Sequence, residues 1–165
     1  MWWSRRALLL GAGSALGACG FAPVYGPGGG ALSLRGAVLA DDPDTDEGFF
    51  LVERIEQRLG LPEAPRLALA YAIETEEEAL AIDGSNNITR WNVEGAVLWT
   101  LRPLGADPEA PPLLAGADEA FASYSATGSP VATLASARDA RRRLMVILAD
   151  RIVARLLGAA AALPA

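Results

Sequence analysis

The chain has 165 residues and a formal net charge of −6 at pH 7, from 20 acidic and 14 basic residues. All of the basic residues are arginines, because the sequence contains no histidine and no lysine. These absences exclude Ser–His and Cys–His catalysis, a P-loop lysine, Schiff-base chemistry and histidine-ligated zinc. The single cysteine excludes an internal disulfide, and the acidic balance argues against a general nucleic-acid-binding protein.

Residues 1–18 have the pattern of a lipoprotein signal peptide. Arg5 and Arg6 precede an apolar run over residues 7–18, which is too short to cross a membrane as a helix. The run ends in Leu-Gly-Ala before Cys19, and this resembles the lipobox at which a bacterial peptidase cuts before a diacylated cysteine. We therefore expect Cys19 to be the lipidated first residue of the mature chain.

The residues around the cysteine also bear on the destination of the protein. Stable attachment to a bilayer needs more than one acyl chain, and a diacylglyceryl group with an added N-acyl chain meets that need. Gly20, rather than an aspartate, follows Cys19, and in similar lipoproteins this favours the periplasmic side of the outer membrane. Residues 4–9 also resemble a twin-arginine signal, which leaves both the Sec and the Tat export route open. Residues 19–30 are expected to form a lipidated N-terminus and a glycine-rich tether.

A single α+β domain is predicted over residues 31–158, with a flexible tail over 159–165. Alternating apolar residues over 32–38 predict a short first strand. Residues 49–59 carry an apolar stripe on one side and end before Gly60, which predicts an amphipathic helix of about three turns. Both elements precede the main part of the predicted sheet.

Three further strands are predicted over residues 67–75, 91–101 and 113–125, with a bulge at Gly95. A helix is predicted from the capping residue Ser136 to about 157, and it is apolar around so much of its circumference that it needs cover on more than one side. That cover is either the domain core or a partner. The predicted architecture is a two-layer α+β sandwich in the order β-α-β-β-β-α, with two helices on an approximately four-stranded, mainly antiparallel or mixed sheet.

Two acidic clusters are candidate sites. Residues 41–47, together with Glu53, resemble a calcium loop, but Gly48 falls one position later than that loop requires. The alternative is that these carboxylates cap the following helix. Glu74 and Glu76–Glu78 are either paired catalytic carboxylates or a solvated strand edge that prevents aggregation. We favour the structural interpretation of both clusters, and expect no catalytic residue, no metal and no cofactor.

Arginines and tryptophans supply two further candidates. Residues 138–143 contain four arginines, which either recognise phosphate or carboxylate groups or form a solvated helix start with Asp139 and Arg143 paired. Trp91 and Trp99 share one face of their predicted strand, and we expect them to be core residues rather than a ligand platform.

Two segments resemble the LPS-assembly lipoprotein (LptE) family as found in alphaproteobacteria. The first is CGFAPVYG at residues 19–26, the start of the expected mature chain. The second is SYSATGSPVATLAS at residues 123–136, where a predicted strand leads into the last helix. The predicted order of elements also matches that family, so the resemblance extends over most of residues 19–157.

This resemblance implies a non-catalytic partner of the large outer-membrane β-barrel LptD. In the family, the lipoprotein lies inside or against the barrel lumen, helps the barrel to assemble, and assists delivery of lipopolysaccharide to the cell surface. Basic residues near the second hairpin and before the last helix contact lipopolysaccharide, and the matching residues here are Arg90 and Arg138, whereas the turn carries Asp83. The alternatives are an auxiliary lipid- or partner-binding lipoprotein of another envelope transport complex, and a hydrolase that uses Glu74–Glu78.

Overall fold

The computed structural model describes residues 26, 30–82 and 84–163. The predicted signal peptide, Cys19 and most of the predicted tether lie outside these residues. No helix in the described ranges combines the length and apolar character needed to cross a membrane.

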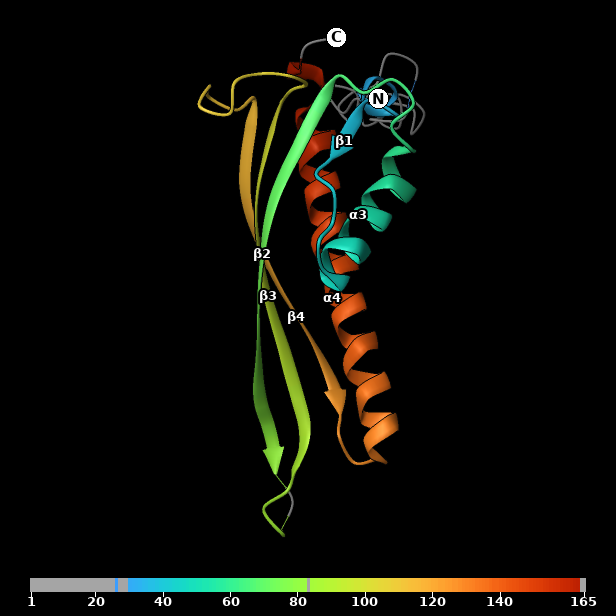
Figure 1. The fold of residues 1–165 in the computed structure, drawn as a ribbon, viewed down its shortest axis with the longest axis vertical. Coiled ribbons are helices and arrows are strands. Elements are labelled where there is room, and N and C mark those ends of the chain that lie inside the picture. The colour runs from blue at the N-terminus through green and yellow to red at the C-terminus, as the bar shows by residue number, and fades with distance from the viewer. Residues whose placement is uncertain (1–25, 27–29, 83, 164–165) are drawn as a thin grey trace, which may run out of the picture.

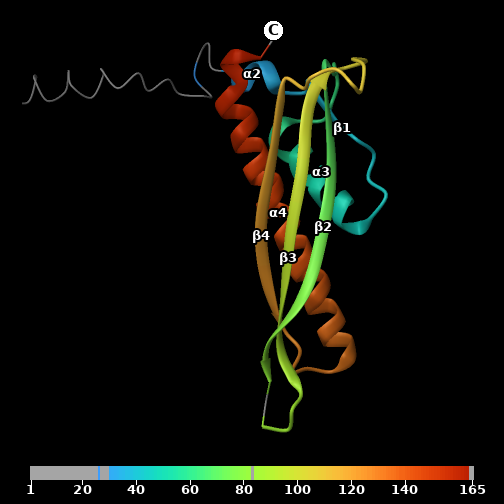
Figure 2. The same ribbon diagram turned by 90° about the vertical axis from the view of Figure 1, so that its left-hand side faces the viewer.

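The described chain forms two layers, a four-stranded sheet and a layer of helices on one of its faces (Figures 1 and 2). The strand order is β1-β2-β3-β4, with β1 parallel to β2 and the other pairs antiparallel. The strands are β1 (Val38–Ala40), β2 (Leu67–Ile82), β3 (Ile88–Pro103) and β4 (Leu114–Ser125). The helices are α2 (Ala31–Leu34), α3 (Asp46–Leu59), α4 (Pro130–Ala159) and the 3-10 turn η1 (Ala160–Ala162). The predicted α+β class, layer arrangement and order of the main elements are confirmed.

The predicted first strand is wrong over residues 32–34, which belong to the short helix α2. Ala31 and Leu34 are buried, whereas Leu32 is exposed, so the burial follows a helical spacing of three rather than a strand spacing of two. Gly36 then adopts a positive φ of 66°, which turns the chain into β1. Only the last residue of the predicted alternation, Val38, lies in a strand.

The last helix begins earlier than predicted. The Ser129 side chain accepts a hydrogen bond from the Ala132 amide at 3.3 Å, and Pro130 occupies the first turn, where its missing N–H costs nothing. Ser136 therefore lies inside α4 instead of capping it. At the other end, residues 160–162 form η1 and Ala160 is buried, so folded structure continues beyond the predicted domain end at 158.

The predicted need for cover on more than one side of α4 is met within the domain. The helix packs against β3 and β4 on one side and against α3 on the other. Its buried residues are Ala137, Ala140, Leu144, Met145, Leu148, Ala149, Ile152, Val153 and Leu156. These side chains form the centre of the core, which α3 and the odd-numbered residues of β3 complete.

Two glycines allow α4 and a tryptophan to lie close to the sheet. The register of β3 is continuous through Gly95, so the predicted bulge is wrong. A Cβ at Gly95 would lie 2.9 Å from Cδ2 of Leu144 on α4, which indicates that the missing side chain permits close packing. On β4, a Cβ at Gly116 would lie 2.6 Å from the Trp99 ring, whose N–H donates to the buried Asp118 at 3.0 Å. Trp99 is therefore a core residue, as predicted.

We expect Gly116→Ala to lower the free energy of unfolding by about 1–3 kcal/mol, because the new methyl group would force Trp99 away from Asp118. Gly158→Ala is the matched control, since a Cβ there has no neighbouring atom within 4 Å and the residue lies in α4. That change should be neutral or slightly stabilising. Chemical denaturation followed by tryptophan fluorescence measures both, and equal stability of the two variants would contradict the packing argument.

Asp150 of α4 links the two long helices. It accepts hydrogen bonds from Arg54 of α3 at 3.1 and 3.0 Å, and Arg58 forms a second ion pair with it. Burial alone would raise the pKa of Asp150, but the hydrogen bonds and charges of the two arginines outweigh burial and hold the pKa below its ordinary value. Asp150 therefore contributes stability above its ordinary pKa of 3.8, and that contribution is lost as pH falls through the lower pKa of the folded state.

We expect Asp150→Asn to cost about 1 kcal/mol at neutral pH, the scale of a partly exposed ion pair. The difference from the unsubstituted protein should shrink steadily below about pH 4, where the unfolded state takes up the proton first. Asp139→Asn is the control, because Asp139 forms an exposed pair with Arg143 within one helix. Denaturation series at several pH values measure the effect, and a pH-independent difference would contradict it.

Candidate functional site

The predicted basic cluster on α4 is satisfied by carboxylates of the same chain. Each of its four arginines forms an ion pair, most of them with residues of α3 or β2. The pairs are Arg138–Asp46 at 3.5 Å, Arg141–Glu77 at 2.8 Å, Arg141–Glu47 at 3.7 Å, Arg142–Glu53 at 3.4 Å and Arg143–Asp139 at 2.9 Å. The predicted pairing of Asp139 with Arg143 is confirmed. This cluster therefore holds helices and sheet together, although exposed pairs contribute only about 1 kcal/mol or less each.

Arg138 is the most exposed member of that cluster. Its side chain and that of Asp46 are 70% and 73% exposed, and its guanidinium lies 6.0 Å from the centre of the Phe50 ring. Both contacts are with α3. A phosphate group at Arg138 would have to compete with a long, solvated ion pair, which is a small obstacle.

Arg90 lies in a different layer of the molecule. Side chains of successive strand residues alternate between faces, and Val93, Gly95 and Val97 are buried against the helices. Even-numbered β3 residues such as Arg90 therefore project from the opposite face, which no helix covers (Figure 2). Among the described residues Arg90 forms no ion pair. The structure does not bring Arg90 and Arg138 together into one site.

The acidic run at residues 41–47 leads into α3. The cap is the Thr45 hydroxyl, which accepts from the Gly48 amide at 3.1 Å, and two carboxylates, Asp46 and Glu47, lie in the first turn. Acidic residues in the first turn interact favourably with the positive end of the helix dipole. The predicted role of the acidic run at the start of the helix is therefore confirmed for Asp46 and Glu47, although the capping side chain is Thr45. In the described ranges, His, Cys, Asp and Glu side chains form no group of three that could hold a metal ion.

The Tyr71 hydroxyl lies beside the start of α3, close to Gly48. It is buried and has no hydrogen-bond partner among the described residues. Burial raises the pKa of Tyr71, and the negative charges of Asp44, Asp41 and Asp42 raise it further. Tyr71 is therefore a neutral side chain at the edge of the core.

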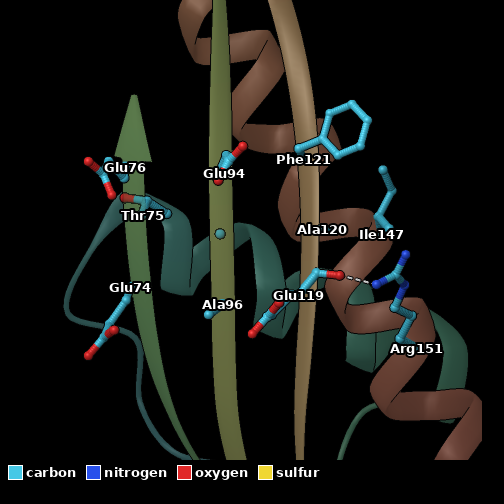
Figure 3. A pocket seen from close by; sticks show the side chains of 11 residues that line it. Glu74, Thr75, Glu76, Glu94, Ala96, Glu119, Ala120, Phe121, Ile147 and Arg151 are labelled. Carbon is cyan, nitrogen blue, oxygen red and sulfur yellow. Dashed lines mark hydrogen bonds between the residues drawn. The ribbon is translucent and has the colours of Figure 1, made fainter. Parts of the chain in front are cut away.

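The predicted cluster Glu74–Glu78 divides between the two faces of β2. Glu77 faces the helices, where it pairs with Arg141 and accepts from the Tyr124 hydroxyl at 3.3 Å. Burial raises the pKa of Tyr124, and the Glu77 charge adds to that effect. Glu74, Glu76 and Glu78 project from the uncovered face, where Figure 3 shows Glu76 beside Glu94 of β3 and Glu74 beside Ala96. Glu77 therefore lies apart from the other three, of which Glu74 and Glu76 line an open pocket together with Glu94.

The uncovered face of the sheet is not among the candidate sites that the sequence predicts. Its upper part carries small apolar residues around the exposed Leu98, together with Thr100 and Arg102, and its lower part carries glutamates beside the exposed Phe121. The apolar residues, assigned from strand alternation and register, are Ala68, Ala70, Ala72, Ala96, Ala115 and Ala117. Alternation of alanine with larger residues in residues 67–73 was visible in the sequence, but which set faces the helices depends on the pairing with β3.

No family model matches the sequence, and no curated protein matches it. Solved structures of bacterial lipoproteins are similar in fold. A lipoprotein from Caulobacter crescentus is similar with a TM-score of 0.64 and 16% identity, over 80% of this chain and 96% of that chain. Rare lipoprotein B from Shewanella oneidensis is similar with a TM-score of 0.53 and 13% identity, over 74% of this chain and 92% of that chain.

A minor lipoprotein from Acinetobacter baumannii is similar with a TM-score of 0.51 and 14% identity, over 74% of this chain and 89% of that chain. At these identities the likeness extends to the fold alone. The chain therefore has a fold that occurs in bacterial lipoproteins.

Proposed function

We propose that this chain is an outer-membrane lipoprotein that scaffolds or plugs an LptD-type β-barrel and assists lipopolysaccharide assembly at the cell surface. The observation that carries the proposal is the fold shared with bacterial lipoproteins over 80% of the chain. The lipobox before Cys19 is a second, independent support, because it comes from residues outside the described fold. An alternative is an auxiliary lipoprotein of another envelope transport complex, which the shared fold would equally suit.

A binding role without catalysis agrees with the arrangement of the charged groups. The carboxylates of Glu74–Glu78 lie on two faces of β2, and the arginines of α4 are used in ion pairs with α3 and β2. Glu74 and Glu76 line an open pocket with Glu94, Glu119 and Arg151, whereas Glu77 pairs with Arg141 on the opposite face, so the cluster as a whole does not face one substrate. The surfaces that remain available are the uncovered sheet face and the edge of β2, which suit contact with another protein.

A scaffold needs a rigid body, and the described domain supplies one. Residues of α4 are buried on two sides, and the helix is tied to α3 by Asp150 and to β4 by Arg155, which donates to the buried Asp118 at 2.9 Å. The long β2–β3 hairpin extends beyond the helical layer (Figure 1). Such a projecting hairpin on a firm base is able to reach into a barrel lumen.

Lipopolysaccharide contact is proposed at two separate positions. Arg90 lies near the far end of the projecting hairpin, where Leu80 and Ile82 are exposed apolar side chains. Arg138 lies on the helical layer. Guanidinium groups bind phosphate in a bidentate manner, so each arginine is suited to one lipid A phosphate.

The lipid anchor and the barrel partner are tested in one experiment. In cells fed labelled palmitate, the tagged full-length protein should carry label, fractionate with the outer membrane and co-purify with a large β-barrel protein. Cys19→Ser should abolish the label and release the protein from the membrane, because no acyl chain then anchors it. Ser14→Ala, within the same expected signal peptide, is the control and should change none of these results.

Two outcomes would contradict this proposal. Unlabelled protein, or protein free in the cytosol, would overturn the lipoprotein assignment. Labelled protein that co-purifies with an inner-membrane ATPase complex instead of a barrel would favour the alternative of an auxiliary transport lipoprotein.

We expect Arg90→Ala with Arg138→Ala to weaken binding of purified lipopolysaccharide at least fivefold, the loss of about 1 kcal/mol of charge-assisted contact. Arg35→Ala is the matched control, because Arg35 is an exposed arginine that precedes β1, far along the chain from the hairpin end. Titration with labelled lipopolysaccharide measures the affinity. Unchanged affinity in the double variant would remove both residues from the proposed site.

A further inference from the structure

The two edges of the sheet differ in how their backbone groups are used. The outer edge of β4 is covered by arginines of α4, which donate to backbone carbonyls that point away from β3. The pairs are Arg143 with Ser123 at 3.1 Å, Arg151 with Glu119, and Arg155 with Ala117 at 3.4 Å. Residues four apart on a helix are separated by about 6 Å along its axis, and outward carbonyls two residues apart on a strand are separated by about 6.8 Å. Because these spacings are similar, successive turns of α4 stay level with successive outward carbonyls of β4. Figure 3 shows the Arg151 contact.

The opposite edge of the sheet is unpaired along most of β2. The strand β1 pairs only with residues 67–69 of β2. The Leu69 carbonyl accepts from the Asp41 amide on that outer side, so the backbone groups of odd-numbered residues point outward while even-numbered ones bond to β3. In the described chain no strand pairs with the outward groups of Ile73, Thr75, Glu77 and Ala79. We call residues 73–79 the β2 edge.

The uncovered face beside the β2 edge carries uncompensated negative charge. Glu74, Glu76 and Glu78 project from this face, and within the described ranges none of them forms an ion pair. Glu76 lies directly opposite Glu94 of β3, a like-charge cross-strand pair that is unfavourable. A partner that brings cations to this face would relieve the repulsion.

We propose that the β2 edge binds an extended segment of another protein, with Arg or Lys at alternate positions, as an added antiparallel strand of the sheet. Outward N–H and C=O groups supply the backbone pairing, and the three carboxylates select the side chains. Alternate side chains of a strand are about 6.8 Å apart, the same spacing as the three glutamates, so each cation meets one carboxylate. This inference concerns a contact surface beyond the proposed function and does not depend on which protein supplies the strand.

The charges exclude a second copy of the chain as the occupant. Pairing of two β2 edges would bring two rows of glutamates together, which is unfavourable. The β4 edge of another copy is no better placed, because Arg143, Arg151 and Arg155 already occupy its carbonyls. A basic strand from a different protein is the occupant that fits both the open backbone groups and the charge.

The probe for this surface is a fluorescein-labelled heptapeptide, Arg-Val-Arg-Val-Arg-Val-Arg, titrated with the full-length protein in detergent micelles. We expect saturable binding in fluorescence anisotropy. Thr75→Pro should weaken that binding at least fivefold, since it removes an outward N–H without breaking a bond to β3. Thr75→Val is the matched control, because it keeps the N–H and should leave binding unchanged. Glu76→Gln should weaken binding about twofold to fivefold through the lost charge.

A second peptide separates strand addition from simple charge attraction. In a strand added antiparallel to β2 with its arginines facing the glutamates, the valine N–H groups point toward β2, so N-methylation of the valines should abolish binding while the charge stays the same. Equal binding of both peptides, or no binding of the first, would overturn the proposal. So would a peptide-free dimer that Thr75→Pro dissociates, because the β2 edge would then bind a second copy. If Thr75→Pro fails to fold by circular dichroism, Glu76→Gln and the methylated peptide still decide the question.

Discussion

The burial of α4 on two sides is the constraint on which the rest of this structure depends. One side of the helix packs on β3 and β4, and the other packs on α3, so that Leu144, Met145, Leu148 and Ile152 are fully buried. The polar residues of α4 are confined to the part of the helix that these contacts leave exposed. From there its arginines reach α3 or the β4 edge, so the same helix fixes both the core and the charge distribution around it.

This arrangement makes the sheet asymmetric in two ways. One face is covered by helices while the other is bare, and one edge is blocked by arginines while the other is unpaired beyond Leu69. Natural sheets commonly protect their edges with charge or covering side chains, and β4 is protected by neighbours from α4. The β2 edge has only glutamates, which repel acidic or identical partners but attract a basic one. Protection by charge is therefore selective.

The sequence predicts well the features that depend on local pattern, and poorly those that depend on distant partners. Periodicity predicts α3 and the positions of the three long strands, but β2 extends to Ile82, seven residues beyond the predicted end at residue 75. Periodicity failed at residues 32–34, where apolar spacing suits both a strand and a helical turn and only contact with the core decides. Gly95 is similar, because a bulge and a close approach by Leu144 have the same sequence signal. The division of Glu74–Glu78 between two faces required the register with β3.

The distribution of arginines constrains how an acidic protein of this kind could contact an anionic lipid. The arginines of residues 138–143 balance carboxylates of α3, β2 and α4 itself, so they are not free cations in the described structure. Arg90 has no such partner there, and it lies beside exposed apolar residues near the end of the β2–β3 hairpin. A phosphate at Arg138 would compete with Asp46, whereas no carboxylate of the described residues pairs with Arg90. Of the two proposed lipopolysaccharide contacts, the hairpin end is therefore the one that faces less competition within the described structure.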